Sequence, residues 1–533
     1  MLKSFKILLF FATCGAFMYA DDNKPLCFPI DRISFYSLNS YLYNSDSEID
    51  LINKHYTFIY KLSKPYTNKC LDSKGIVSLL SILNENAIKK GYITTRFGIG
   101  EQDLSSRELE VRVQIGKVGN IDYQSNKNIR FFNKDFDIKE GDILNLKKLE
   151  QGISNLNRIS SLNTKMQILP SYSEDSSDIK ISINKIKSPF SGSFSFDNGG
   201  VLFDNYQNTL LLKYENPFKL ADIITLYFLG AIPFDNKDIG KNHSFYSSLS
   251  YSVPVRRFLL ESNFSYSFNA MDIPLANFTI NYNGRSFNLD SKLSYALIAN
   301  AKHNVSVGLG FGARMQDSFI EDVELLVQRQ RILQYSLFSQ YIFTLNPYKF
   351  IVNLSLLNGF SLPNIDLNIH DKGFSYVLPT INLYAYVPFS AWKFKTLYNA
   401  SIKTQVAQDR LYANEQMLIG GRYAVRGFHG LNLSGQIGVI AKNDLNIYIP
   451  TFGSGIWHLV LVPSAGFDLG YIRNLDSTIY SNLSKNGIFL IGGGVGLQAF
   501  VKYLNTQVWY NFPLYSPYKM DTQNLYLSIS ANF

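Results

Sequence analysis

Residues 187–533 alternate between apolar and small or polar side chains, and this pattern constrains the fold more than any other feature of the chain. Valine, leucine and phenylalanine hold the odd positions of residues 305–312, whereas serine and glycine hold the even ones. Successive side chains of a β-strand point to opposite faces, so the alternation predicts strands with one apolar and one polar face. Such strands build either a soluble sandwich with its apolar face inward or a membrane barrel with its apolar face toward lipid.

The composition of the chain favours the membrane barrel. Aromatic residues make up 15% of it and charged residues only 17%, whereas a soluble domain is typically about 25% charged. Abundant aromatics suit the girdles that a barrel places at the two membrane interfaces. Beyond its first residues the chain has no run of roughly 18 apolar residues, which a membrane-spanning helix needs. The net charge of +9 is spread along the chain and does not indicate a nucleic-acid partner.

Three further features of residues 187–533 favour a barrel. No helical pattern interrupts the segment, and at roughly 22 residues per strand and connection it predicts about sixteen strands. Apolar–proline steps recur and are expected to mark short periplasmic turns: Val253-Pro254, Val387-Pro388, Ile449-Pro450 and Phe512-Pro513. The chain ends in an alternating strand whose last residue, Phe533, is aromatic. This ending resembles the closing strand of outer-membrane barrels, which the barrel-assembly machinery reads.

The start of the chain predicts export. Residues 1–20 carry two lysines before an apolar stretch and are expected to be a signal peptide cleaved after Ala20. A weaker alternative makes Cys14 a lipoprotein cysteine. Cys27 and Cys70 remain in the mature chain, and an even pair in an oxidising compartment favours a disulfide over two unpaired thiols.

Before the alternating segment, helical and strand patterns predict two small α+β domains. The first, residues 21–116, is expected to hold strands at 29–36, 92–97 and 109–115 and a helix over 76–88 that Gly91 ends. The second, residues 117–186, is expected to hold a helix over 146–159 and strands at 166–169 and 179–183.

Six stretches occur in a fixed order along the chain: Cys27-Phe28-Pro29-Ile30 with Ile33; Gly91-Tyr92-Ile93-Thr94-Thr95-Arg96 with Gln102-Asp103-Leu104; Leu144-Asn145-Leu146 with residues 149–152 and 155–158; Asp197-Asn198-Gly199-Gly200 with Asn216-Pro217; residues 420–428; and Phe467-Asp468-Leu469-Gly470. Together they resemble the two-partner secretion transporters, the outer-membrane half of filamentous-haemagglutinin and haemolysin export systems. These transporters belong to a superfamily of barrels that carry polypeptide-transport-associated (POTRA) domains.

The resemblance implies a domain plan and a function. Residues 21–116 and 117–186 are expected to be two POTRA domains in the periplasm, and residues 187–533 a barrel in outer-membrane lipid with a long sixth extracellular loop near 407–434. The POTRA domains would recognise a large exoprotein, unfolded in transit, and the barrel pore would secrete it. A barrel-assembly insertase of the same superfamily and a passive porin are the alternatives; the insertase usually carries more periplasmic domains.

The resemblance also implies the site residues. The sixth loop is expected to fold into the barrel so that Arg426 meets Asp468 on the inner wall, where a guanidinium can bind a carboxylate through two hydrogen bonds. The alternative is a solvated Arg426 and an unrelated luminal acid. Residues 21–26 are too short for the plug helix that many family members carry, so the loop is expected to be the obstruction. The remaining motif residues of the loop are Gly421, Arg422, Tyr423, Val425, Gly427 and Phe428.

Nothing in the sequence indicates an enzyme. The six histidines are scattered without metal-ligand spacing. The glycine run at 492–496 lacks the Lys-Ser/Thr of a phosphate loop and lies in a strand pattern, where small residues let the luminal face be crowded. We therefore expect no catalytic residue, no metal and no cofactor.

Overall fold

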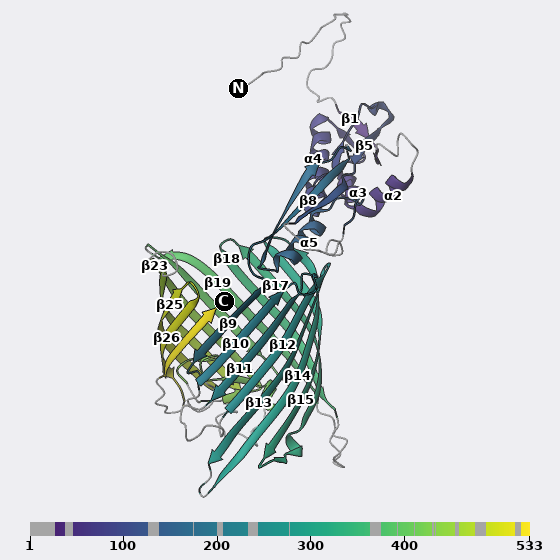
Figure 1. Ribbon diagram of the computed structural model, residues 1–533. Coiled ribbons are helices and arrows are strands. Elements are labelled where there is room, and N and C mark those ends of the chain that lie inside the picture. Colours follow the sequence, from purple (N-terminus) through teal and green to yellow (C-terminus); the bar gives the residue numbers. More distant parts are fainter. Residues whose placement is uncertain are drawn as a thin grey trace, which may run out of the picture. The chain divides into compact units, whose positions relative to one another are not determined.

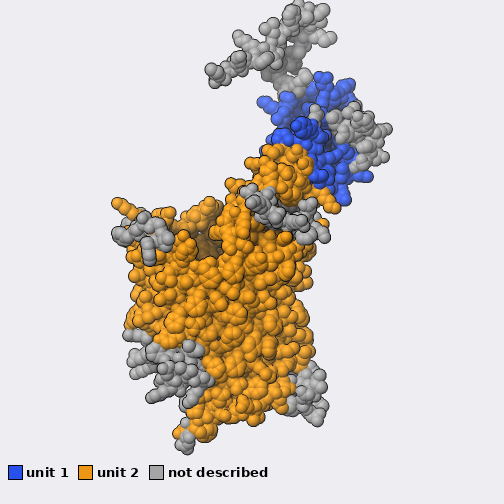
Figure 2. Space-filling view, viewed as in Figure 1, with its two compact units in different colours: residues 1–119, 140–146, 170–177 blue, residues 120–139, 147–169, 178–533 orange. Residues whose placement is uncertain are grey.

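The computed structural model describes residues 27–37, 46–125, 138–173, 175–199, 206–232, 243–274, 276, 278–362, 375–391, 393–409, 411–428, 431, 433–452, 458–474, 487–517 and 524–533. The expected signal peptide and Gly200 lie outside these residues. The chain divides into two compact units, residues 1–119, 140–146 and 170–177 in one and residues 120–139, 147–169 and 178–533 in the other (Figure 2). None of the described helices combines the length and apolarity needed to cross a membrane.

The first domain packs helices on a small mixed sheet. Its three-stranded sheet has the order β2-β5-β4, and β1 pairs with β3 in a two-stranded sheet. The elements are β1 (Phe28–Ile30), β2 (Arg32–Ser37), α2 (Asp46–His55), α3 (Phe58–Ser63), η1 (Lys64–Tyr66), β3 (Lys69–Leu71), α4 (Ser73–Lys90), β4 (Arg96–Gly98), η2 (Leu104–Ser106) and β5 (Glu108–Gln114). The inward side of β5 and the apolar stripe of α4 form the core: Leu79, Leu83, Leu109, Val111 and Val113.

The predicted helix of this domain is confirmed, and the local signals explain its ends. The Asp72 carboxylate accepts a hydrogen bond from the Gly75 amide at 2.8 Å and caps the start of α4. Gly91 ends the helix with a φ of 98°, a conformation that favours glycine. The strand predicted at 92–97 is wrong over most of its length, because Tyr92 donates its amide to Ala87 in the helix end and only residues 96–98 pair as a strand.

Helices α2 and α3 were not predicted. Ile52 of α2, Tyr56 in the link between the two helices and Ile59 of α3 are buried and spaced by four and three, which is the helical signal that could have revealed this segment. The phenol of Tyr56 shares a 2.8 Å hydrogen bond with Thr95, and burial raises its pKa.

The second domain has a sheet of order β6-β8-β7 and one helix. Its elements are β6 (Lys117–Ser125), α5 (Leu146–Asn157), β7 (Leu162–Pro170) and β8 (Ser176–Lys185). The predicted helix and the two predicted strands are confirmed, whereas β6 was not predicted. Leu149 and Leu156 form the buried side of α5.

Within the described residues, sixteen long antiparallel strands form a closed barrel (Figure 1). They are β9 (Phe190–Asp197), β10 (Tyr206–Glu215), β11 (Ile223–Ile232), β12 (His243–Val255), β13 (Phe258–Pro274), β14 (Thr279–Ala299), β15 (His303–Ile320), β17 (Gln330–Leu345), β18 (Tyr348–Ser361), β19 (Ser375–Ala391), β20 (Phe394–Gln405), β23 (Ile437–Phe452), β24 (Leu459–Arg473), β25 (Ile488–Val501), β26 (Leu504–Tyr515) and β27 (Asn524–Asn532). The short β16 (Val323–Glu324) and η4 (Leu326–Gln328) lie between β15 and β17. The predicted fold class and strand number are confirmed.

The apolar side chains of the alternating strands face outward, as in a membrane barrel, and not inward, as in a soluble sandwich. Leu309 and Phe311 are 66% and 51% exposed on the outer surface, whereas Ser306 and Gly310 line a cavity inside. In the last strand Leu527 and Ile529 are exposed and Tyr526 and Ser528 are buried. Apolar side chains therefore face outward toward lipid, and small polar ones face the lumen.

The first and last strands close the barrel. Residues 193–197 of β9 pair antiparallel with residues 528–532 of β27, and Gly192 and Phe533 exchange two backbone hydrogen bonds of 2.8 and 2.9 Å. The Phe533 ring lies beside Gly192, where an added Cβ would overlap it, and its centroid is 6.3 Å from that of Phe190. The terminal aromatic residue thus packs at the seam of the barrel.

The interpretation of the apolar–proline steps as turns was wrong. Pro254, Pro388, Pro450 and Pro513 all lie inside strands, in β12, β19, β23 and β26. The first three lie within a few residues of the end of their strand, while Pro513 lies near the opposite end of the barrel. A proline costs one ladder hydrogen bond, which a strand tolerates best near its end.

The cysteines of the first domain form a disulfide. Cys27 and Cys70 are bonded, their Cα atoms are 5.3 Å apart, and they are separated by 43 residues of sequence. Pro29 pairs with Cys70 in the β1–β3 sheet, so the bond joins the entry of the domain to the strand before α4.

Replacing Cys70 with serine should destabilise the first domain by about 2–4 kcal/mol, because the open chain gains conformational entropy. Urea unfolding followed by limited proteolysis would measure the loss. Cys27→Ser should give the same loss, and the double variant no more than either single one. The heat resistance of the barrel in detergent should be unchanged; a parallel loss there would contradict a local role.

Candidate functional site: the anchors of loop six

The sixth loop, between β20 and β23, folds back into the barrel. It contains η5 (Ala413–Glu415) and the paired strands β21 (Met417–Ile419) and β22 (Leu433–Gly435). Ile419, Val425 and Phe428 of the loop are fully buried and cluster with Ile472 and Leu490 of the barrel wall. The apolar contacts therefore hold the tip of the loop against β24 and β25.

Arg426, in the tip, binds Asp468 on β24 through three hydrogen bonds. Its backbone amide and its Nε donate to Asp468 Oδ2 at 3.0 and 2.7 Å, and its Nη2 donates to Oδ1 at 3.0 Å. The carboxylate has no solvent exposure and Arg426 has 6%. This two-sided contact is the bidentate geometry that a guanidinium offers a carboxylate. We call this contact the Arg426 anchor.

Two further charges and an aromatic ring complete the Arg426 anchor. Nη2 of Arg426 also donates to Asp444 Oδ1 at 2.7 Å, and Lys442 Nζ lies 3.8 Å from Asp468 Oδ2. The guanidinium carbon is 5.1 Å from the centroid of a Trp509 ring. Two cations and two carboxylates balance one another, which limits the cost of burying each of them.

Glycines of the wall make room for the tip. A Cβ at Gly466 would overlap the Arg426 guanidinium, one at Gly492 the Arg426 carbonyl oxygen, and one at Gly470 the Val425 side chain. The glycine run that begins at Gly492 therefore serves loop packing. On the loop itself, Gly427 has a φ of 88° and lies against the backbone at Phe512.

The other motif residues shape the tip. Gly421, with a φ of 71°, donates its amide to the Phe428 carbonyl at 2.8 Å and closes the turn. Lys442 Nζ donates to the Arg422 carbonyl at 2.8 Å, and the Arg422 guanidinium carbon lies 3.0 Å from the ring centroid of Tyr526 on the last strand. Tyr423 is 63% exposed.

A second contact of the loop was not predicted from the sequence. Glu415, in η5, forms an ion pair with Arg314 of β15, and its Oε1 accepts a hydrogen bond from Gln334 Nε2 of β17 at 2.9 Å. Gln334 Nε2 also donates to the Tyr376 hydroxyl at 2.7 Å, and Gln405 Nε2 donates to the Glu415 carbonyl at 2.8 Å. We call this contact the Glu415 anchor.

The Glu415 anchor has an apolar support, in which Leu411 of the loop packs with Ile332 and Leu378 of the wall. In the sequence, the Glu415 anchor is indicated only by Arg314, which holds an inward position of an alternating strand. That position does not reveal which acid Arg314 binds. Loop six is thus held at two places, by β23 and β24 at its tip and by β15 and β17 at its first arm.

Gly466→Ala should displace the guanidinium of Arg426 and loosen the tip, because the new Cβ would occupy its place. Breaking a buried ion pair costs about 3–5 kcal/mol, so the ratio of open to closed times in planar-bilayer recordings should rise by about a hundredfold to a few thousandfold. Gly230→Ala is the matched control, since a Cβ there has no neighbour within 4 Å. Identical recordings for both variants would refute the Arg426 anchor.

Glu415→Gln should weaken the Glu415 anchor, because the ion pair with Arg314 is lost while the shape is kept. We expect an effect of about 1–3 kcal/mol on the same ratio. The two anchors share no partner residue, so its effect should add to that of Gly466→Ala. Asp322→Asn, at an exposed acid beyond β15, is the control; an equal response there would show that the effect is only one of net charge.

The chain matches known sequence families along most of its length. Residues 175–499 match the family described as haemolysin secretion/activation protein ShlB/FhaC/HecB, residues 57–116 match the ShlB-type POTRA domain, and residues 117–170 match a POTRA domain. The barrel lies in the outer membrane and the POTRA region in the periplasm.

Individual relatives have low sequence identity to this chain but align with most of its length. The outer membrane transporter CdiB-2 of Burkholderia pseudomallei (strain 1026b) is 25% identical over 76% of this chain and 69% of its own length. The hemolysin transporter protein HpmB of Proteus mirabilis is 25% identical over 77% and 72%. The structure of CdiB from Acinetobacter baumannii superposes with a TM-score of 0.81 at 22% identity, over 96% of this chain and 91% of that one, which establishes a shared fold. Because the family match spans more than half of its residues, the chain belongs to the haemolysin secretion/activation protein family ShlB/FhaC/HecB.

Proposed function

We propose that this outer-membrane transporter takes one large exoprotein from the periplasm, unfolded, and releases it at the cell surface through the barrel lumen. The observation that supports this most is the anchoring of loop six: within the described residues, polar contacts at Asp468 and Glu415 hold a loop inside a closed barrel. Barrels of 16 strands or more are wide enough for an aqueous channel. Polar and charged contacts of this kind can be exchanged for contacts with water when the loop leaves the lumen.

The POTRA domains would capture the exoprotein at their sheet edges. β2 and β7 are the outermost strands on one side of their sheets, and an edge strand offers backbone groups to which an extended chain can add. A helix surface is the second option, because Val77 and Ile88 of α4 are 65% and 51% exposed. Either mode recognises a chain that has not yet folded, which is the state that can enter a barrel.

The proposed cycle needs no covalent chemistry. The partner would bind, pass and fold outside, and no bond in it would be made or broken. The released protein should therefore keep the mass that its mature sequence predicts.

Deleting the gene in its native host should remove one large protein from the cell surface and medium, measured by quantitative mass spectrometry. The wild-type gene should restore it at its full mass, and Asp468→Asn should restore it only partly, because the buried carboxylate that holds Arg426 loses its charge. Loss of many outer-membrane barrels would instead indicate an assembly insertase. Loss of small-solute uptake with unchanged surface proteins would indicate a porin.

A further inference from the structure

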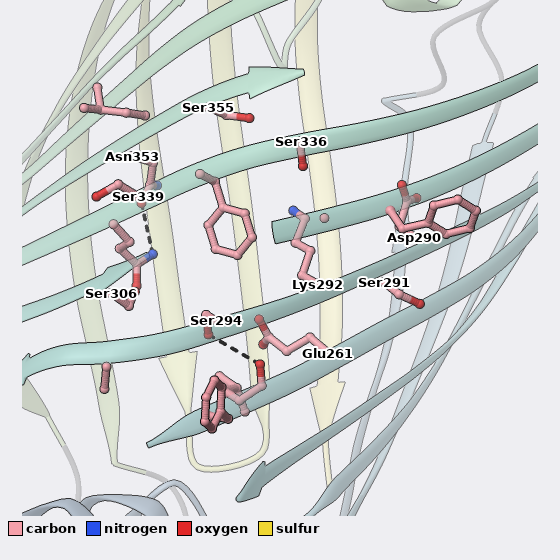
Figure 3. Close-up of a pocket in the computed structure, with 18 of the residues that line it drawn as sticks. Glu261, Asp290, Ser291, Lys292, Ser294, Ser306, Ser336, Ser339, Asn353 and Ser355 are labelled. Carbon is pink, nitrogen blue, oxygen red and sulfur yellow. Dashed lines mark hydrogen bonds between the residues drawn. The ribbon is translucent and has the colours of Figure 1, made fainter. Parts of the chain in front are cut away.

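A cavity of about 620 Å³ lies inside the barrel (Figure 3), and none of its lining residues belongs to the Arg426 anchor. Its wall comes from β13–β15 and β17–β19, and residues at the end of α5 complete its rim. Neither anchor of loop six accounts for this space, although its residue Gln334 belongs to the Glu415 anchor. The inference below rests on the proposed function and concerns what occupies the cavity.

Amide and hydroxyl side chains form a row across the cavity wall. Ser306 pairs with Gln340, Gln340 with Asn353, and Asn353 with Asn382, so four adjacent strands each contribute one side chain at the same level. All four line the cavity. Gln340 Nε2 donates to Asn353 Oδ1 at 3.0 Å, which orients the two amides. We call Ser306, Gln340, Asn353 and Asn382 the amide row.

The amide row is suited to the backbone of another chain. Each amide presents donors and an acceptor, and a hydroxyl presents both. Ser306 and Asn382 have no hydrogen-bond partner among the described residues, so their groups are available to an occupant. Ser336 and Ser355 lie on the next levels of the same wall. They also have no hydrogen-bond partner among the described residues. An extended backbone also presents alternating N–H donors and C=O acceptors, whatever its side chains, so it can pair with the donors and acceptors of the amide row.

The charges on this wall nearly cancel, because three basic residues and two acidic ones line the cavity: Arg158, Arg257, Lys292, Glu261 and Asp290. Lys292 Nζ lies 5.9 Å from the Phe338 ring centroid, and Figure 3 labels the two acids, Glu261 and Asp290, on the same wall. Serine, asparagine and glutamine account for 14 of the 30 lining residues. Such a wall does not hold a charged segment tightly, and it does not select one sequence.

The rim adds a donor that lacks a partner. Nη2 of Arg158 donates to Ser252 Oγ of β12 at 2.6 Å, whereas its Nη1 is buried without a hydrogen-bond partner in the described structure. Asn155, one turn earlier, donates to the Arg256 carbonyl at 2.7 Å and fixes this end of α5 to the turn after β12. Arg158 Nη1 can therefore meet a carbonyl oxygen that enters beside α5.

We propose that the cavity is a binding subsite for an uncharged, extended segment of the exported chain, held through its backbone by the amide row and Arg158. Its inner end is Gln334, the amide that holds Glu415 of loop six. A segment that fills the subsite as far as Gln334 competes with Glu415 for the same N–H groups. Occupation thereby weakens the Glu415 anchor and links arrival of the chain to release of the loop.

The test uses the full-length protein in planar bilayers and an end-blocked, uncharged peptide of glycine, asparagine, serine and threonine, added on the side of the POTRA domains. The peptide concentration that halves the ion current measures binding. Asn353→Asp with Asn382→Asp removes two N–H donor groups at constant shape and should raise that concentration about tenfold. Gln507→Glu makes the same chemical change on another part of the luminal wall and should leave it within about twofold.

A fallback variant, a salt test and two competing probes complete the experiment. Asn382→Ser is the fallback if the double variant does not form a heat-resistant barrel, and a rise of about threefold is then expected. Added salt should not change the block, since ions screen charge pairs and not neutral hydrogen bonds. Equal block in the row variants and the wild type, tighter and salt-sensitive block by a lysine-rich peptide, or equal block by a neutral oligosaccharide would overturn the subsite. Such a result would leave the proposed function standing if the wild-type gene still restores the exoprotein.

Discussion

The hydrogen bonds that join β9 to β27 are the constraint on which the rest of the structure depends. In lipid no water is present to satisfy an open strand edge, so a sheet can persist there only if its first and last strands pair. Residues 193–197 and 528–532 supply that pairing, and the exchange between Gly192 and Phe533 extends it to the last residue of the chain. Closure in turn separates an apolar outside from a polar inside, and the two anchors of loop six lie in the inside space.

Inside that space the charge pairs are shielded from bulk water, which strengthens them and makes an unpaired charge costly. This explains why Arg426 is satisfied so fully, with Asp468 on two sides, Asp444 on a third and Trp509 nearby. It also explains the glycines opposite the tip. Gly466 and Gly492 provide the volume in which a guanidinium and a backbone can reach the wall. The loop and the wall are therefore complementary in both charge and shape.

Different walls of the lumen hold different parts of loop six. The wall of β23–β25 holds the tip of loop six through charges and apolar contacts. The wall of β15 and β17 holds the first arm through Glu415 and, farther along the same strands, carries Ser306 and Gln340 of the amide row. Gln334 belongs to both the second anchor and the cavity. A chain in transit and the loop that obstructs it would thus meet at one residue, which allows one to displace the other without any energy source in the periplasm.

The sequence by itself determined the barrel, the approximate strand number and the helix that ends at Gly91, because period-two alternation and a left-handed glycine are local properties of the chain. A family resemblance named Arg426 and Asp468 as partners. Only the tertiary structure decided the Glu415–Arg314 ion pair, the place of Pro254 and Pro513 inside strands, and the row from Ser306 to Asn382. These features depend on which strands stand side by side and at what register, and residues far apart in sequence acquire a common level only when the barrel closes.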